Sequence, residues 1–404
     1  MITVLFEGWR LLQHSYGNVL AFLLIHLWKQ YGPDKMNKII FYVRECSYHD
    51  INWKNNQKLT YSQEYNRILK NFKTYNGEKV DIIYRQTYPY NLEPPQIPKT
   101  PICVFYTSEF AILNNSYFHH DPKQDIRSYL IKNPNFYFTA PSEWSLRGMT
   151  SYLDDKTRNK VISHGVDTSI FYRHSNDSIR RQIRRKYNIL DNEVLLINIG
   201  AMTMNKGIFL ILEAFHNLVI IKKLPFKLLL KGMTDLYKSR EFVDTYINHL
   251  GYNTALKSHI IFIDGTLNYS EINDLFNASD LYISPYLAEG FGLTMLEALA
   301  SGLRVLVPRT GSASDYIDPI YKNGGEKYIY YIDSIIIRDN DGLYKNQIDK
   351  TSIINILSKN MRDIKNVMDD KTYLLLKKYI KKNYSWYKVS TDLYNYFMDI
   401  IVQK

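Results

Sequence analysis

The chain has 404 residues, 45% of them hydrophobic and 23% charged, a composition typical of a globular protein with two domains and not of a disordered or fibrous one. The longest apolar run, residues 19–28, is too short to span a bilayer, and the N-terminus lacks the features of a signal peptide. Because there are only two cysteines, Cys46 and Cys103, no disulfide framework is expected. We predict a cytoplasmic protein, with peripheral contact to an anionic membrane as a further option.

The formal net charge of +11 would suit a nucleic acid, an anionic membrane or an anionic small molecule as partner. The basic residues are mostly dispersed, and the one dense run is RRQIRRKY, Arg180 to Tyr187. We interpret this run as a solvated helix face, with a nucleic-acid surface as the less favoured alternative. No nucleic-acid partner is therefore expected.

In chain order, the first half begins with a predicted strand at residues 2–8 and a helix at 16–30. Further strand-like runs follow at residues 38–45, 79–85, 101–107, 135–141 and 160–166. The second half alternates more regularly between strands and helices. Its predicted strands are residues 194–200, 226–232, 259–265, 280–286 and 304–308, the last of which we expect to close the series.

Short apolar strands that alternate with helices predict an α/β fold whose parallel sheets are covered on both faces. Two such halves give two doubly wound, Rossmann-like domains joined near residues 165–178. Ligands of these sheets bind beyond the carboxyl ends of the strands. The loops at those ends are residues 8–17, 106–110, 200–207, 265–270 and 286–292, and we expect a site with walls from both domains.

The stretch YLAEGFGLTMLEALASG, residues 286–302, combines a glycine turn with two glutamates, Glu289 and Glu297. The helix after the turn is apolar on most sides, so Glu297 is less well explained as an ordinary surface residue. Its side chain leans toward the N-terminus of the helix, where free N–H groups favour an anion such as phosphate. Beside that anion, Glu297 could accept hydrogen bonds from the hydroxyls of a ribose, and Glu289 could bind what the phosphate carries.

A second loop, GAMTMNKG at residues 200–207, follows a predicted strand and begins a helix. Lys206 lies where its ammonium could meet the same phosphate, although a lysine at a helix start is more often simply exposed to solvent. The segment is not a Walker P-loop, because the G-x-x-x-x-G-K-[ST] pattern is absent.

These motifs together resemble retaining glycosyltransferases of the GT-B fold, in particular glycosyltransferase family 4 (group 1). EGFGLTMLEALASG, residues 289–302, fits the E-x7-E motif of that family, and NIGAMTMNKG, residues 198–207, fits its strand–G–x–K–G segment. Looser likenesses are HSYGNVLAFLL, PSEWSLRGM, VISHGVDTSIF and SWYKVSTDLYNYF, which begin at residues 14, 141, 161 and 385. The resemblance implies an acceptor domain at 1–172, a donor domain at 173–380 and a terminal helix at 381–404 that packs back on the first domain.

The resemblance also implies roles for single residues. Lys206 would stabilise the leaving diphosphate, Glu289 would contact the transferred sugar, and Glu297 would bind the donor ribose. Backbone amides of the turn would contact sugar and phosphate, Gly17 would approach the diphosphate, and a further loop would hold the base. The turn residues are Gly290, Phe291, Gly292, Leu293 and Thr294, and those of the base loop are Gly265, Thr266 and Leu267.

Two positions depart from the family pattern. Ala201 stands where an arginine often cooperates with the lysine, and Glu109 stands where a first-domain strand usually ends in a histidine. Glu109 is a candidate acceptor-orienting group or base, and a hydrogen-bonded loop carboxylate is the equally weighted alternative.

The expected reaction moves a sugar from a UDP- or GDP-linked donor to a hydroxyl of a glycan, lipid or protein, with retention of anomeric configuration. A lysine and a helix N-terminus can stabilise the leaving diphosphate without a metal, so no metal or other cofactor is expected. The short polar runs at residues 119–121 and 339–341 are not predicted as metal sites. The alternatives are a non-catalytic scaffold that binds nucleotide sugars and a basic nucleic-acid-binding protein.

Overall fold

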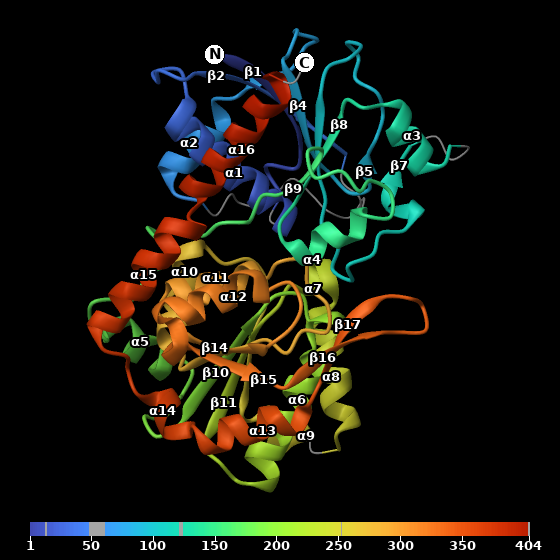
Figure 1. The fold of residues 1–404 in the computed structure, drawn as a ribbon. Helices are drawn as coiled ribbons and strands as arrows, with labels where there is room; N and C mark the ends of the chain where they lie inside the picture. Colours follow the sequence, from blue (N-terminus) through green and yellow to red (C-terminus); the bar gives the residue numbers. More distant parts are fainter. Residues whose placement is uncertain (13, 48–60, 121–123, 252, 403–404) are drawn as a thin grey trace. The chain divides into compact units, whose positions relative to one another are not determined.

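The computed structural model describes residues 1–12, 14–47, 61–120, 124–251 and 253–402 (Figure 1). The chain divides into two compact units. Unit 1 comprises Met1–Gly165 and Tyr384–Lys404, and unit 2 comprises Val166–Asn383. The division therefore falls somewhat before residue 172, where we expected the first domain to end. Each unit is described by itself.

Unit 1 is built on a seven-stranded sheet in the order β3-β2-β1-β4-β6-β8-β9, in which every neighbouring pair is parallel. A separate short pair joins β5 to β7, also in parallel. The strands are β1 (Ile2–Gly8), β2 (Ile39–Glu45), β3 (Lys73–Thr74), β4 (Ile82–Gln86), β5 (Tyr90–Asn91), β6 (Ile102–Phe105), β7 (Phe118–His119), β8 (Phe136–Ala140) and β9 (Asn159–Val161).

Helices cover both faces of this sheet. On one face the terminal helix packs beside α1, where the rings of Phe22 and Trp386 stack with their centroids 5.5 Å apart. The Phe397 ring of the same helix contacts Tyr84 on β4. On the other face, Ile126 and Leu130 of α3 join the strands in one hydrophobic core. The helices of unit 1 are α1 (Ser15–Tyr31), α2 (Gln63–Lys70), α3 (Ile126–Lys132), α4 (Glu143–Leu146) and α16 (Trp386–Val402).

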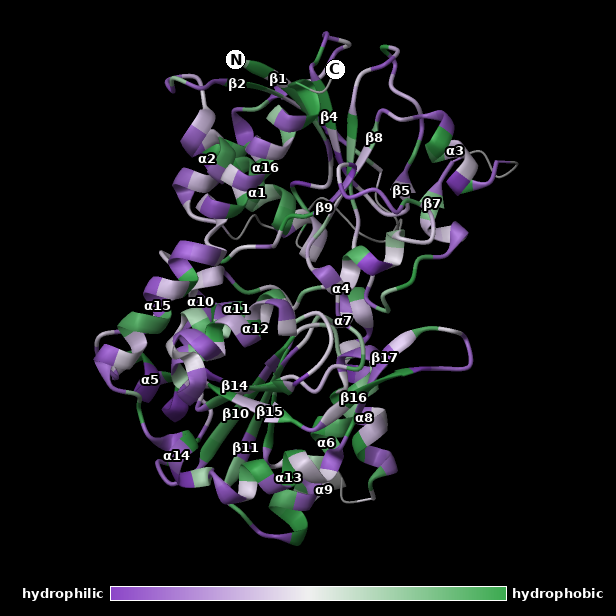
Figure 2. Cartoon of the chain, in the orientation of Figure 1, coloured by the Kyte–Doolittle hydropathy of each residue, from purple (hydrophilic) through white to green (hydrophobic). Residues whose placement is uncertain are grey.

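Unit 2 contains a second parallel sheet of six strands in the order β12-β11-β10-β13-β14-β15. The central strands are mostly apolar and almost wholly buried, as expected for strands covered on both faces, and they appear largely green in Figure 2. The strands are β10 (Val194–Ile199), β11 (Phe226–Lys231), β12 (Ile260–Ile263), β13 (Leu281–Ile283), β14 (Arg304–Pro308) and β15 (Ile329–Ile332), followed by the antiparallel pair β16 (Ser334–Arg338) and β17 (Tyr344–Ile348).

The helices of unit 2 also cover both sheet faces. Residues of α6, α8 and α13 share a core with alternate strand positions, whereas Phe276 of α10 contacts Tyr282, which points to the opposite face. The helices are α5 (Ser178–Lys186), α6 (Ile208–His216), α7 (Thr234–Tyr237), α8 (Ser239–His249), α9 (Asn253–Lys257), α10 (Tyr269–Ala278), α11 (Leu293–Ala300), α12 (Ser314–Ile320), α13 (Lys350–Lys359), α14 (Met361–Lys365) and α15 (Asp370–Tyr384).

Two predictions about unit 2 were wrong. The strand at 304–308 does not close the series, because β15 pairs in parallel with β14 at the edge of the sheet. The two tyrosines of β15 are only partly buried, so this strand lacks the aliphatic run by which we predicted the other strands. The basic run on α5 is not a wholly solvated face either, since Arg184 is 5% exposed and bonds to Asp280.

In the part of the chain that the structure describes, none of the helices combines the length and the apolar character needed to cross a bilayer.

Candidate functional site

Lys206 and Glu289, which lie far apart in the sequence, meet at the carboxyl ends of the strands of unit 2. The Lys206 Nζ atom lies 2.8 Å from Glu289 Oε2, and the other carboxylate oxygen accepts a hydrogen bond from the backbone N–H of Gly290 at 3.0 Å. The two side chains are 23% and 19% exposed, so the pair is largely shielded from water but a ligand can still reach it. The structure thus joins the two loops that the sequence indicated.

The position of Lys206 depends on how tightly its loop packs against the segment before Glu289. Gly207 has a φ of +71°, and a Cβ atom there would lie 2.0 Å from the Pro285 carbonyl oxygen. The carbonyl of Asn205 accepts hydrogen bonds from the backbone N–H groups of Leu287 at 2.7 Å and Ala288 at 3.1 Å. Only glycine fits this left-handed conformation and close backbone approach without strain.

The glycine turn leads directly into α11. Gly292 has a φ of +91° and precedes the first helical residue, Leu293. Its carbonyl accepts a hydrogen bond of 2.9 Å from the Tyr316 hydroxyl, and the Tyr316 ring lies 4.8 Å from that of Phe291. These contacts fix the backbone where the first N–H groups of α11 have no partner within the helix. The turn is therefore a shaped helix N-terminus suited to an anion.

Glu297 lies one turn into α11, on a helix whose other sides are mostly buried. Its side chain is partly exposed, but the surrounding protein removes enough water to raise the pKa of the carboxyl from 4.5 to about 8. Thr294, on the same stripe, bonds to the Tyr282 hydroxyl at 2.7 Å. These properties fit a carboxyl that binds a polar ligand better than an ordinary surface glutamate.

The loop predicted to hold the base follows β12. Gly265 has a φ of +81° with open space where a side chain would lie, Thr266 is exposed and Leu267 is half-buried. Asp264 accepts hydrogen bonds from the backbone N–H groups of Gly265 at 2.8 Å and Thr234 at 2.9 Å, which ties the loop to the segment after β11. This geometry leaves the loop accessible at the edge of the sheet.

Sequence reasoning missed Lys231, the last residue of β11. It is 6% exposed, its Nζ atom lies 3.2 Å from the Gly232 carbonyl, and burial lowers its pKa to about 8 while the charge of Asp264 opposes that shift. The available signal was a lysine at the carboxyl end of an otherwise apolar strand. It adds a buried cationic group to the edge that carries Lys206.

In unit 1, the predicted site residues are Gly17, which has a local explanation, and Glu109. A Cβ atom at Gly17 would lie 2.0 Å from the Leu12 carbonyl oxygen, so the close approach of the chain's own loop already requires glycine. Glu109 is half-buried in the loop after β6, and its backbone carbonyl accepts a hydrogen bond of 2.8 Å from Trp144 Nε1.

The short polar runs carry no metal-like arrangement among the described residues, where no group of three or more potential ligands gathers. Asp339 instead closes a turn, accepting from the backbone N–H of Leu343 at 2.9 Å. Asp121, in the run at 119–121, lies outside the described residues.

Two α/β units, each with a parallel Rossmann-like sheet, define the GT-B class of fold. Residues 179–325, within unit 2, match the family model described as "Glycosyl transferases group 1". A solved glycosyltransferase from Rickettsia africae ESF-5 is similar with a TM-score of 0.66 at 14% identity, over 100% of this chain and 99% of that one. Anabaena Alr3699/HepE, solved in complex with UDP-glucose, gives a TM-score of 0.61 at 12% identity, over 98% and 99% of the two chains.

At these identities the structural likeness concerns the fold alone. Among curated proteins, the chain is 26% identical over 158 residues to "Uncharacterized glycosyltransferase MJ1607" of Methanocaldococcus jannaschii, which is 39% of this chain and 38% of that protein. The chain spans about two fifths of the length of the curated relatives it matches first. The family-model match, residues 179–325, contains Lys206, Glu289 and Glu297.

Proposed function

We propose that the protein is a retaining glycosyltransferase of the group 1, family 4 type. It transfers a sugar from a nucleoside-diphosphate sugar, UDP- or GDP-linked, to a hydroxyl of a glycan, lipid or protein acceptor, and it needs no metal. The group 1 family match within unit 2 and the GT-B fold support this proposal. Because the Anabaena protein of the same fold was solved with UDP-glucose, UDP-linked sugars are the first donors to test.

The observation that carries the proposal is the Lys206–Glu289 pair beside the N-terminus of α11. Departure of a nucleoside diphosphate builds negative charge on phosphate oxygens. The Lys206 ammonium and the free N–H groups of the helix stabilise that charge by fixed electrostatics, which is the strongest general means of lowering such a barrier. Glu289, anchored through the Gly290 N–H, then orients both the ammonium and the sugar that is transferred.

The remaining residues complete the donor site. Glu297 accepts hydrogen bonds from the ribose hydroxyls, the loop at Gly265 to Leu267 holds the base, and the acceptor hydroxyl attacks the same face that the diphosphate leaves. In that geometry the departing phosphate oxygen takes the acceptor proton, so that configuration is retained. Glu109 is the candidate acceptor-orienting group or base.

A donor panel tests the proposal directly. We expect release of nucleoside diphosphate from one UDP- or GDP-sugar in the presence of acceptor sugars or lipids, unchanged by EDTA, with an α-linked donor giving an α-linked product by NMR. Lys206→Ala and Glu289→Gln should each lower kcat about a hundredfold or more, as loss of a charge-stabilising group does. Lys359→Ala and Glu241→Gln, which change exposed residues of α13 and α8, are the matched controls.

Ala201 stands in place of the usual arginine, so the protein could bind a nucleotide sugar without transferring the sugar. Binding of a nucleotide sugar without turnover of any donor would reject the enzyme and support a non-catalytic scaffold. Salt-sensitive binding to nucleic acid, with no affinity for nucleotide sugars, would reject both.

A further inference from the structure

A cavity of about 240 Å³ opens at the amino-terminal edge of the unit 2 sheet. Asp280 immediately precedes β13, and Arg304 is the first residue of β14, so both mark the ends at which these strands begin. Lys206 and Glu289 follow strands of the same parallel sheet at their carboxyl ends. The cavity is therefore separate from the proposed donor site, and what it binds does not depend on the proposed function.

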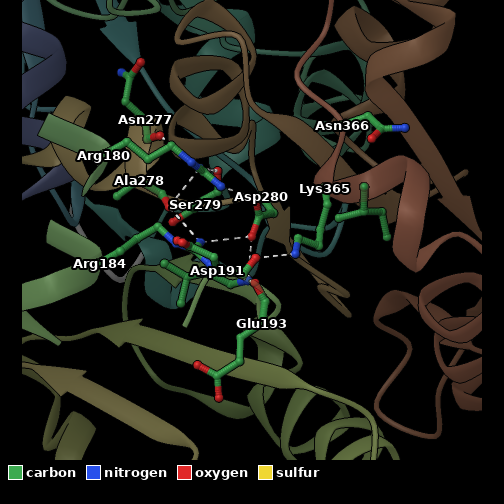
Figure 3. Close-up of polar contacts among 12 residues, drawn as sticks. Arg180, Arg184, Asp191, Glu193, Asn277, Ala278, Ser279, Asp280, Lys365 and Asn366 are labelled. Carbon is green, nitrogen blue, oxygen red and sulfur yellow. Dashed lines mark hydrogen bonds and ion pairs between the residues drawn. The ribbon is translucent and has the colours of Figure 1, made fainter. Parts of the chain in front are cut away.

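One wall of the cavity is held by arginines of α5 (Figure 3). Arg180 Nη1 donates to the carbonyls of Ala278 at 3.0 Å and Ser279 at 2.9 Å, which closes the C-terminal end of α10. Its Nη2 atom pairs with Asp280, and Arg184 pairs with the same carboxylate at 3.2 Å. The carboxylate of Asp280 thus pairs with two guanidinium groups, whose other acceptors are neutral backbone carbonyls.

Arg304 also lines the cavity, beside the start of β13, and is only 8% exposed. Its Nη1 atom donates to the carbonyls of Ile364 at 3.2 Å and Asn366 at 2.7 Å, and its Nη2 atom lies 2.8 Å from the thioether sulfur of Met368. Throughout the described ranges no carboxylate forms an ion pair with it. The charges of Asp280 and Asp363 act on Arg304 without forming an ion pair, and a thioether is a weak acceptor, so this buried guanidinium retains capacity for an anion.

The charges around the cavity leave an excess of positive charge. Three carboxylates line it, those of Asp177, Asp280 and Asp370, and the Asp370 side chain is 87% exposed, so that water screens it. The cationic side chains that line the cavity are Arg173, Arg180, Arg304 and Lys365, with Arg184 directly behind Asp280.

We propose that this cavity binds a phosphate-type anion, either inorganic phosphate or the phosphoryl group of a small metabolite, with Arg304 as its anchor. A guanidinium offers parallel N–H donors that match phosphate oxygens, and such charge-assisted bonds are about twice as strong as neutral ones. The volume of about 240 Å³ accommodates phosphate or a small phosphorylated sugar. Occupancy would stabilise unit 2 from the edge opposite the donor loops, because a ligand that binds only the folded state raises its stability.

Titration calorimetry at constant ionic strength tests this proposal with inorganic phosphate and with glucose 1-phosphate as separate titrants. We expect saturable binding of at least one titrant to the wild type, and the tighter of the two identifies the source. Arg304→Met should weaken it about tenfold or more, the cost of losing a hydrogen bond to a charged group. Lys365→Met, at the partly exposed rim, should weaken it less, and it provides a second variant if Arg304→Met fails to fold.

Two controls separate this site from the donor site. Lys206→Ala should bind the anion like the wild type, and so should Lys359→Met, which alters an exposed lysine outside the cavity. The proposal is overturned if neither titrant binds the wild type, if Arg304→Met and Lys365→Met bind with wild-type affinity, or if Lys206→Ala alone abolishes binding, because the anion would then occupy the donor edge.

Discussion

Replacing Glu297 by glutamine should change how the stability of unit 2 depends on pH. Burial raises the pKa of this carboxyl from 4.5 to about 8, so the folded protein holds a proton that the unfolded chain releases. Between these values the unfolded state binds fewer protons, and the free energy of unfolding must fall as the pH rises. The stability conferred by the neutral carboxyl is complete below about pH 4.5 and is lost by the time the pH has passed 8.

The magnitude follows from the same two values. At about 1.4 kcal/mol for each pH unit, the difference between 4.5 and about 8 sets a ceiling of about 5 kcal/mol. The Glu297 side chain is partly exposed, and solvent screening lowers the expected loss to about 2–4 kcal/mol. Glutamine has nearly the same shape and does not titrate, so Glu297→Gln should lack this part of the pH dependence.

Urea unfolding across the pH range, followed by far-UV circular dichroism, measures the difference. The five tryptophans fall within residues 1–165 and 384–404, so their fluorescence follows unit 1 and leaves the remaining circular dichroism transition to unit 2. Glu241→Gln, at an exposed position of α8, is the matched control. Equal pH slopes for the wild type and Glu297→Gln would show that the carboxyl is not desolvated and refute this reasoning.

Further predictions concern the packing around the site. Gly207→Ala should lower the unfolding free energy of unit 2 by about 2–4 kcal/mol in urea titrations, because its Cβ would clash with the Pro285 carbonyl at a φ of +71°; wild-type stability would contradict this packing. Burial lowers the pKa of Lys231 to about 8, so wild-type stability should rise with pH between about 8 and 10.5. Lys231→Met should remove that rise and stabilise unit 2 at pH 7 by about 1–3 kcal/mol; a destabilised variant would instead indicate a favourable partner for the ammonium.

Much of the fold is predictable from the sequence because its strands are buried on both faces. The residues of β1 and β14 were predicted at their observed bounds, since each is a mostly apolar run ending at glycine or proline. The edge strand β15 escaped, because its tyrosines are half-exposed and no apolar run marks it. A strand at the edge of a sheet is less buried than a central strand, so it does not need the apolar run by which we predicted the central strands.

The candidate site was predictable as loops but not as contacts. The glycine turn and Lys206 follow separate strands, and parallel topology brings strand ends together, yet their spacing gives no sign that Lys206 would pair with Glu289. Burial of single charges was equally hidden. Arg184 in a basic run and Lys231 at a strand end look solvent-exposed in the sequence, and only the packing of α10 and β12 around them reveals otherwise.

Titration calorimetry with UDP- and GDP-sugars shows directly whether the carboxyl-end loops of unit 2 bind a nucleoside-diphosphate sugar. We expect saturable binding of one donor family to the wild type, weakened about tenfold or more by Lys206→Ala through lost charge-assisted bonds and weakened by Glu297→Ala through lost hydrogen bonds to the ribose. Lys359→Ala should bind like the wild type. Equal donor affinity in all of these proteins, or no donor binding by the wild type, would rule out a donor site built on Lys206 and Glu297.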